Sequence, residues 1–212
     1  MYLPIYHRED RLDLQHDLIR AYPLGLLIAT GKDGLIANPI PFLLDAEGGS
    51  KGVLKAHVAR ANPFWQEYDA AQEALVVFQG PQCYVSPNFY ASKKETGRVV
   101  PTWNYVCVQA YGFLKIMDDE AWVEAQLRGL TAVHEATQQR PWSIDDAPPD
   151  FKATQLRAIV GIEIEIDRIE GKWKMSQNRV PKDRESLVAA LYEMTDENAK
   201  AVASLVAAAR QT

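Results

Sequence analysis

The sequence predicts an α+β fold built on a closed or partly closed antiparallel β-barrel, with helices placed at intervals around it. Strand-like segments joined by short turns make up much of the chain, and amphipathic segments with helical spacing lie between and after them. The clearest strand covers residues 159–169, where Ile162, Ile164 and Ile166 alternate with acidic residues. This alternation is typical of an antiparallel strand with one buried and one exposed face.

The composition limits the size, the location and the partners of the protein. The 212 residues can bury an ample core, and we treat them as a single domain, residues 1–212, with a helical extension over about residues 183–212. A net charge of −5 does not favour a surface for binding nucleic acid. The sequence shows no signal peptide, no membrane-spanning run and no cysteine spacing typical of a metal site. We therefore expect a cytoplasmic protein with no membrane partner and no bound metal.

The first part of the chain predicts a helix followed by three strands in a meander. Residues 10–22 form the helix, which Pro23 ends. The strands cover residues 24–30 and 35–44 and continue from Val53, with glycine-containing turns between them. Strands joined in this way pair antiparallel with their neighbours.

The second of these strands contains two prolines that limit its pairing. Pro39 and Pro41 lie two residues apart, so both missing N–H groups fall on the same side of the strand. That side cannot be fully hydrogen-bonded. The strand is therefore either a simple edge strand or the place where the barrel stays open and a flat ligand can lie.

A strand that runs into a capped helix is the most informative stretch of the sequence. The strand begins at Val53, and the helix is predicted over residues 63–72, with Asn62 as its N-cap and Pro63 at its first position. The unpaired N–H groups at such a helix start attract anions.

Three cationic or titratable side chains lie on this stretch. Lys55 and His57 share one face of the strand, and Arg60 stands beside the helix start with a guanidinium suited to phosphate. The alternative interpretation, an ordinary corner with a solvated arginine, describes a much commoner feature of proteins.

The rest of the chain continues the same pattern of strands and helices. The predicted elements are strands 74–79 and 82–85 around a turn at Gly80-Pro81, a polar and aromatic loop 86–101, a long strand 102–116, a helix 120–138, a short helix 150–157, the strand 159–169, a return strand from Lys172 with Lys172 and Lys174 opposite the acidic residues, and two closing helices, 183–194 and from Thr195.

Four motifs in this order and spacing resemble the PaiB-type FMN-binding negative transcriptional regulators. The motifs are His57-Val58-Ala59-Arg60-Ala61-Asn62-Pro63, Ser86-Pro87-Asn88 with Tyr90 and Lys93, Val100-Pro101-Thr102-Trp103-Asn104-Tyr105, and Lys174-Met175-Ser176-Gln177-Asn178-Arg179. The resemblance covers nearly the whole chain. It implies a split β-barrel like that of pyridoxamine-phosphate oxidase, and a homodimer with FMN bound at the subunit interface.

The resemblance also implies a set of flavin-binding residues. The strand of Lys55 and His57 would run along the flavin, and Arg60 and Asn62 would hold its phosphate. Other residues would border the site or close it from the second subunit; they are Ser86, Trp103, Asn104, Lys174, Gln177 and Asn178.

Three functions remain open at this point. The first is negative regulation of transcription, acting on DNA directly or through a flavin-linked signal; the last helix offers only Lys200 and Arg210, at its two ends, to DNA. The second is an FMN-dependent oxidoreductase or flavin reductase with His57 as a candidate proton donor, unless this histidine only bonds its neighbours. The third is haem binding or degradation, for which His57 and His134 are the available axial ligands.

Overall fold

The computed structural model describes residues 1–209. Arg210 and the last two residues of the predicted helical extension lie outside the described residues. The chain forms two compact units. Unit 1 comprises residues 1–18, 79–108 and the described part of 170–212, and unit 2 comprises residues 19–78 and 109–169.

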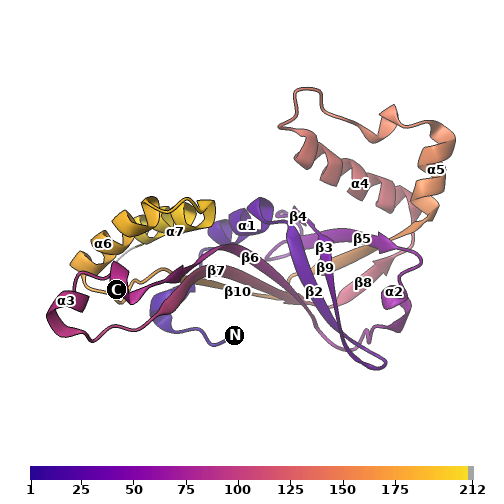
Figure 1. Ribbon diagram of the computed structural model, residues 1–212. Coiled ribbons are helices and arrows are strands. Elements are labelled where there is room, and N and C mark those ends of the chain that lie inside the picture. Colours follow the sequence, from indigo (N-terminus) through magenta and orange to yellow (C-terminus); the bar gives the residue numbers. More distant parts are fainter. Residues whose placement is uncertain (210–212) are drawn as a thin grey trace. The chain divides into compact units, whose positions relative to one another are not determined.

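The predicted fold class is confirmed, because the described residues form antiparallel sheets with several helices (Figure 1). One sheet has the strand order β1-β10-β7-β6-β2-β3 and the other has the order β4-β5-β9-β8. Within residues 1–209 the two sheets do not close into one hydrogen-bonded barrel, as expected of a split barrel. The strands are β1 (Arg8–Glu9), β2 (Leu24–Gly31), β3 (Gly34–Pro41), β4 (Leu43–Asp45), β5 (Val53–Ala59), β6 (Ala74–Val85), β7 (Thr102–Gly112), β8 (Leu114–Met117), β9 (Ile159–Glu165) and β10 (Arg168–Lys174).

The predicted helices appear in the predicted order, and a further short helix, α3, lies in the predicted loop 86–101. Helices α2 and α3 have only four residues each. The helices are α1 (Leu12–Ala21), α2 (Phe64–Glu67), α3 (Lys93–Thr96), α4 (Glu120–Glu135), α5 (Pro149–Arg157), α6 (Pro181–Tyr192) and α7 (Glu197–Ala208), with 3-10 turns at Ile5–His7, Pro87–Phe89 and Ile144–Asp146. None of the helices in the described part of the chain combines the length and the apolar character needed to cross a membrane.

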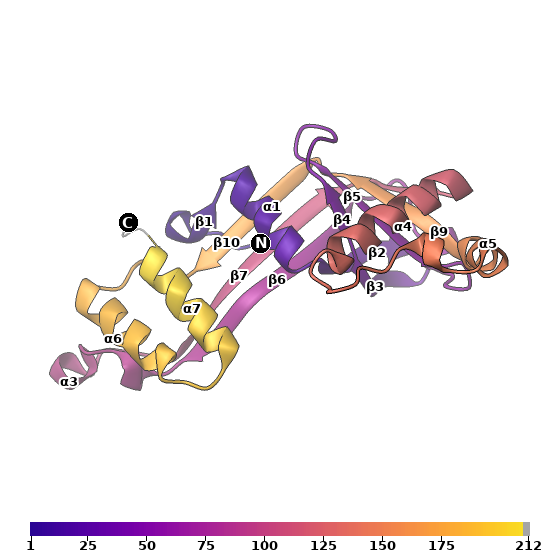
Figure 2. The same cartoon turned by 90° about the horizontal axis from the view of Figure 1, so that it is seen from above.

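In unit 1, helices α6 and α7 pack against each other (Figure 2). Their facing side chains, which include Leu187, Leu191 and Val202, are fully buried. Asp183, in the first turn of α6, is also buried and accepts hydrogen bonds from the backbone N–H and the hydroxyl of Ser92. The closing helices are therefore tied to the loop that follows β6.

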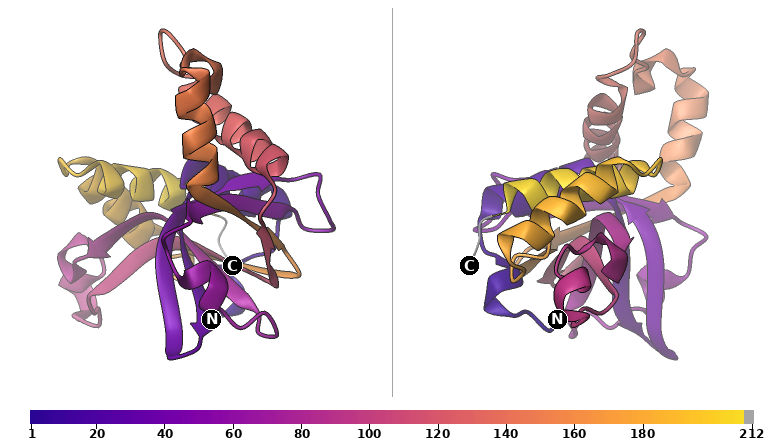
Figure 3. Two further views of the ribbon diagram at one scale, coloured as in Figure 1. Left: turned by 90° about the vertical axis from the view of Figure 1, so that its right-hand side faces the viewer. Right: turned by 60° about the vertical axis from the view of Figure 1, so that its left-hand side comes forward.

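In unit 2, helices α4 and α5 form a hairpin next to the second sheet (Figure 3). Asp119 caps α4 by accepting a hydrogen bond from the Trp122 N–H at 2.7 Å, as the sequence predicts. The second sheet buries one face of β5 and β9, where Leu54, Ile162 and Ile164 have no exposed surface. This confirms the predicted alternation of β9.

The helix predicted over residues 63–72 is wrong in length, because α2 ends at Glu67. Beyond it, Tyr68 adopts an extended conformation and forms a bridge with Gly31, and the Asp69 N–H donates to the Thr30 carbonyl at 2.7 Å. Pairing with the end of β2 thus replaces further helical turns. Local propensity does not report such a distant partner.

Two predicted strand boundaries are also wrong. Gly80 and Pro81 do not form a turn; both are buried inside the continuous strand β6, where they shift its in–out alternation. The long strand predicted over residues 102–116 is divided between the two sheets after Gly112. A Cβ atom at Gly112 would lie 2.0 Å from the Glu165 carbonyl oxygen, so the chain passes too close for any side chain there.

The strand after β9 does not return beside it, which corrects the predicted pairing of lysines with acids. The turn comes earlier, at Asp167, whose N–H donates to the Tyr111 carbonyl at 2.9 Å. Strand β10 then joins the other sheet, where Lys172 lies opposite Arg8 of β1. The lysines of β10 are therefore not neutralised by Glu163 and Glu165.

The prolines of β3 are where the sequence places them, on an edge strand. Among the described strands β3 pairs with β2 alone, with Pro39 opposite Leu26 and Pro41 opposite Leu24. The edge-strand interpretation is confirmed, and the sheet stays open along β3.

Candidate functional site

The predicted site residues form two groups, one in each unit. Unit 2 holds the group on β5 and the corner after it: Lys55, His57, Arg60 and Asn62. Unit 1 holds the others: Ser86, Trp103, Asn104, Lys174, Gln177 and Asn178.

The two side chains on the β5 face in unit 2 bond to neighbouring elements. Lys55 Nζ forms an ion pair with Asp45 Oδ2 at 2.8 Å. His57 Nδ1 donates to Gln126 Oε1 of α4 at 2.9 Å, and Gln126 is buried. His57 therefore links the sheet to α4.

The guanidinium of Arg60 is already engaged by an anion of the chain itself. Its two terminal nitrogens bond to the Asp118 carboxylate at 2.5 and 3.1 Å, and its Nε donates to the Arg157 carbonyl at 2.9 Å. The hydrogen bond from Arg60 lowers the pKa of Asp118 below its usual value. A ligand phosphate at this corner would have to replace that carboxylate.

The N-cap of α2, a helix of only four residues, is Pro63, one residue later than predicted, and Asn62 bonds to the helix start from the position before it. Its Oδ1 accepts a hydrogen bond from the Phe64 N–H at 3.0 Å. Its Nδ2 lies 3.5 Å from Asn38 Oδ1, and the Asn38 amide nitrogen has no partner within residues 1–209. The helix is too short for its dipole to hold an anion, so the corner depends on side chains.

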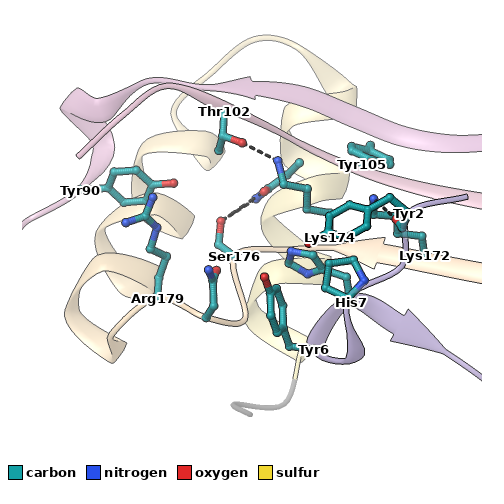
Figure 4. A pocket seen from close by; sticks show the side chains of 13 residues that line it. Tyr2, Tyr6, His7, Tyr90, Thr102, Tyr105, Lys172, Lys174, Ser176 and Arg179 are labelled. Atoms are coloured by element: carbon teal, nitrogen blue, oxygen red, sulfur yellow. Dashed lines mark hydrogen bonds between the residues drawn. The ribbon is translucent and has the colours of Figure 1, made fainter. Parts of the chain in front are cut away.

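Unit 1 contains a pocket of about 370 Å³ that we call the basic pocket (Figure 4). Side chains from the N-terminal segment, β7, β10 and the turn after β10 line it: Tyr2, Pro4, Tyr6, His7, Tyr90, Thr102, Asn104, Tyr105, Lys172, Lys174, Ser176, Asn178 and Arg179. Three of these residues are cations and none is acidic. Figure 4 shows Arg179 and Tyr90 on one side of Ser176, and Lys172 and Lys174 on the other.

Neutral groups alone hold the three cations in place. Lys172 Nζ donates to the Tyr2 carbonyl at 2.9 Å, and Lys174 Nζ donates to Thr102 Oγ1 and to the Trp103 carbonyl. The guanidinium of Arg179 lies 4.7 Å from the ring centre of Tyr90, in a cation–π contact. Burial, and then the charges of Lys172 and Arg179, lower the pKa of Lys174. The pocket therefore carries positive charge that no described carboxylate balances.

A buried polar network forms the floor of the basic pocket. Asn104 Nδ2 donates to Ser176 Oγ at 3.0 Å, and both residues are buried. Ser176 has a φ of +57°, which is unfavourable for a residue other than glycine and is held here by its surroundings. Gln177 lies behind the lining and accepts a hydrogen bond from His7 Nδ1 at 3.0 Å.

The structure brings together only some of the residues predicted in unit 1. Asn104, Lys174 and Asn178 line the basic pocket, and Gln177 supports it. Ser86 and Trp103 do not line it: Ser86 Oγ accepts from the Asn88 N–H in the next turn, and Trp103 is 51% exposed.

Several lining residues are missed by reasoning from the sequence. Lys172 lies two positions before Lys174 on one strand, so alternation alone places both on one face. Arg179 belongs to a motif that the resemblance already uses. No sequence pattern places His7 and Tyr2 at the pocket, because they belong to the start of the chain and are far in sequence from β7 and β10.

Buried donors without acceptors lie beside the predicted flavin residues. Within residues 1–209, no hydrogen-bond partner is found for Asn38 Nδ2 near Asn62, for Gln126 Nε2 near His57, or for the hydroxyl of Tyr90 in the basic pocket. The Nε of Arg184 in α6, which is not among the predicted flavin residues, also lacks one. Buried donors normally have partners. FMN is rich in acceptor oxygens, so these groups fit it.

Comparison with known proteins relates the chain to flavin-binding families. A family model described as "Putative FMN-binding domain" matches residues 1–168. An uncharacterized protein of Emericella nidulans is 35% identical over 241 residues, covering 97% of this chain and 96% of that protein. The Bacillus subtilis protein named Protease synthase and sporulation protein PAI 2 is 28% identical over 206 residues, covering 97% of this chain and 96% of that protein.

Two solved structures share the fold. The flavocytochrome Anf3 from Azotobacter vinelandii is 14% identical, with a TM-score of 0.61, over 92% of this chain and 75% of that one. The FAD and heme binding protein from Mycobacterium smegmatis is 16% identical, with a TM-score of 0.53, over 79% of this chain and 73% of that one. At these identities the likeness concerns the fold alone.

Proposed function

The chain belongs to the PaiB-type FMN-binding family, whose domain model it matches over residues 1–168, and on this premise we propose that it is a homodimeric, cytoplasmic negative regulator of transcription. FMN is the cofactor of this family. When bound, it supplies redox chemistry that no amino-acid side chain provides. The protein's own contribution is to hold the flavin and to transmit its state.

The observation that best supports flavin binding is the set of buried donors without acceptors. Asn38, Gln126 and Tyr90 each place such a donor beside a residue expected to contact FMN. Each unmade hydrogen bond costs roughly 1–3 kcal/mol when the group is buried. Within each unit, a ligand acceptor placed at such a donor recovers part of this cost.

The C-terminal helices favour regulation through a flavin-linked signal over direct reading of DNA. Lys182 pairs with Glu95, and Lys200 pairs with Glu197. Arg184 donates to the carbonyls of Val206 and Ala209 at the end of α7, which satisfies that helix end. Among the described residues of α6 and α7, these cations serve the fold, whereas a recognition helix projects its side chains toward bases.

An exposed apolar sheet face in unit 2 supports the proposed homodimer. On β2 and β3 the cross-strand pairs Leu24–Pro41, Leu26–Pro39, Ile28–Ala37 and Thr30–Leu35 share this face. Leu24 is 64% exposed and Leu35 is 79% exposed. Exposed antiparallel faces usually carry polar residues, and contiguous apolar ones mark interaction sites. A second copy of the chain is the partner we propose for this face.

Two titrations test the function. We expect saturable quenching of FMN fluorescence on adding the protein, and no specific retardation of promoter DNA across a salt series. Anaerobic addition of NADH or NADPH to the flavin complex separates the regulator from an FMN-dependent oxidoreductase. Rapid bleaching of the flavin would favour the enzyme, and a persistent oxidised spectrum supports the regulator.

A further inference from the structure

We propose that the basic pocket binds a phosphate monoester dianion, held by Lys172, Lys174 and Arg179. This deepens the proposed function if the monoester is the phosphate end of FMN. The same pocket would also suit a separate phosphorylated metabolite that binds the protein as an effector of its regulatory activity. The experiment below distinguishes these two sources.

The charge of the pocket selects for an anion. Three cations converge on about 370 Å³, and no carboxylate of residues 1–209 pairs with any of them. Elsewhere in the chain, cations such as Arg60, Arg128 and Lys182 do have acidic partners. The lowered pKa of Lys174, caused by burial and then by its cationic neighbours, indicates that mutual repulsion is not relieved. A dianion between the three would relieve it.

The donors of the pocket are available to a ligand. An ammonium group has three N–H donors; Lys172 uses one for the Tyr2 carbonyl, and Lys174 uses two for Thr102 and Trp103. The Arg179 side chain donates no hydrogen bond to any described residue and instead stacks on Tyr90. Its planar fork can bond two phosphate oxygens at once. The buried Tyr90 hydroxyl adds a donor that lacks an acceptor.

The walls favour an ester over free inorganic phosphate. Tyr2 and Tyr105 both lie within cation–π distance of Lys172, at 5.6 and 5.3 Å. Tyr6 also lines the pocket and contacts the His7 ring edge-on. Aromatic walls beside a cationic end suit a ligand with a flat organic part and a phosphate.

Arg60 is the competing phosphate anchor, and Arg128, an exposed cation paired with Asp145, supplies the control. It is a cation predicted to hold the FMN phosphate, but it already pairs with Asp118. The test therefore compares Arg179→Gln and Lys172→Met with Arg60→Gln and with the control Arg128→Gln. Thermal unfolding of each variant without ligand verifies that it folds.

The probes are FMN, riboflavin, phenyl phosphate and inorganic phosphate, with affinities measured by fluorescence titration or calorimetry. If the pocket holds the FMN phosphate, the parent prefers FMN to riboflavin, and Arg179→Gln weakens FMN by about 10- to 100-fold, the worth of one charged hydrogen-bonding partner. Riboflavin affinity is then unchanged and phenyl phosphate competes with FMN. Arg60→Gln weakens FMN less than Arg179→Gln does, and the control Arg128→Gln binds like the parent.

If the monoester is a separate ligand, phenyl phosphate still binds the parent and fails to bind Arg179→Gln, whereas FMN affinity is equal in both. Should no FMN bind while phenyl phosphate still depends on Arg179, the flavin function is refuted and the pocket inference stands. Equal binding of phenyl phosphate and FMN by the parent, Arg179→Gln and Lys172→Met overturns the inference. The ratio of the affinities for phenyl phosphate and inorganic phosphate indicates how much the organic part of the ligand contributes to binding.

Discussion

Replacing Asp183 tests whether the closing helices hold the wall of the basic pocket in place. The Asp183 carboxylate is 3% exposed and accepts from Ser92 N at 2.8 Å and Ser92 Oγ at 2.7 Å. Ser92 follows Tyr90 by two residues, and Asp183 follows Arg179 by four. One carboxylate thus joins the two segments that carry the Tyr90–Arg179 stack.

The expected loss follows from these two contacts. Hydrogen bonds to a charged group contribute roughly 1.5–3 kcal/mol each, and they share one carboxylate, so Asp183→Ala should lower the free energy of unfolding by about 3 kcal/mol. Asp183→Asn keeps one acceptor oxygen and should lose less. Urea unfolding measures both variants, with an unchanged m-value indicating that the unfolded state is the same.

Asp196→Ala is the matched control for this prediction. Asp196 accepts from the Asn198 N–H at 2.9 Å at the exposed start of α7, and removing such a cap costs about 1 kcal/mol. A loss for Asp183→Ala no larger than that of the control would refute the reasoning. Weakened phenyl phosphate binding by Asp183→Asn, in a folded protein, would show that the contact also positions the pocket.

Three further predictions concern the fold, the assembly and the pH dependence. Gly112→Ala should not accumulate as folded protein, because its Cβ would lie 2.0 Å from the Glu165 carbonyl oxygen. Expression followed by circular dichroism measures this, and a normally folded variant would contradict the close approach. Leu24→Lys should shift the sedimentation coefficient from dimer to monomer while the circular dichroism spectrum stays that of the parent, because Leu24 is 64% exposed on the β2–β3 face. An unchanged dimer would exclude this face. Phenyl phosphate affinity should fall on the alkaline side before the pH reaches the ordinary lysine pKa of 10.5, because the lowered pKa of Lys174 makes it lose its proton before an ordinary lysine. The same titration on Lys174→Met should lack this part of the decline.

The sign of the pH effect on stability follows from the same lysine. The pKa of Lys174 is lower in the folded state, so the unfolded state binds more protons between the two pKa values. The cost of holding the charged lysine is fully present below the folded pKa and disappears as the pH rises through the ordinary lysine pKa. Lys174→Met should therefore remove a rise in stability over this alkaline range.

Elements set by local patterns could be predicted from the sequence. The alternation of Ile162 and Ile164 with acids gives β9, and the turn before Gly34 gives the β2–β3 hairpin. The side chain of Asp119 marks the start of α4. Each of these signals depends on neighbours within a few residues, so no knowledge of the tertiary structure is needed.

Features that depend on distant partners could not be predicted. The predicted helix over residues 63–72 ends early because Tyr68 pairs with Gly31. Gly80 and Pro81 stay inside strand β6, and the sequence does not show which strands pair with it. Lys172 was placed opposite acidic residues because β9 and β10 are consecutive, yet they belong to different sheets. Its lack of an acidic partner, which makes the pocket basic, is therefore a property of the topology.

The predicted flavin residues illustrate the same limit. The sequence identifies Arg60 as a phosphate-binding cation from its place beside a helix start, but it does not reveal that Asp118 occupies the guanidinium. It identifies Lys174 and Asn178, while Tyr90 and His7 become partners only through folding. The assignments of all the predicted residues to the flavin stay predictions: Lys55, His57, Arg60, Asn62, Ser86, Trp103, Asn104, Lys174, Gln177 and Asn178.

The most direct test of flavin binding is the stoichiometry of FMN that co-elutes with the protein. The purified chain is incubated with excess FMN and passed over a gel-filtration column, and the absorbance spectrum of the protein peak is recorded. We predict a flavin spectrum with close to one FMN per chain, at an elution volume that corresponds to a dimer. A colourless protein peak, with all the FMN in the small-molecule fractions, would contradict the account.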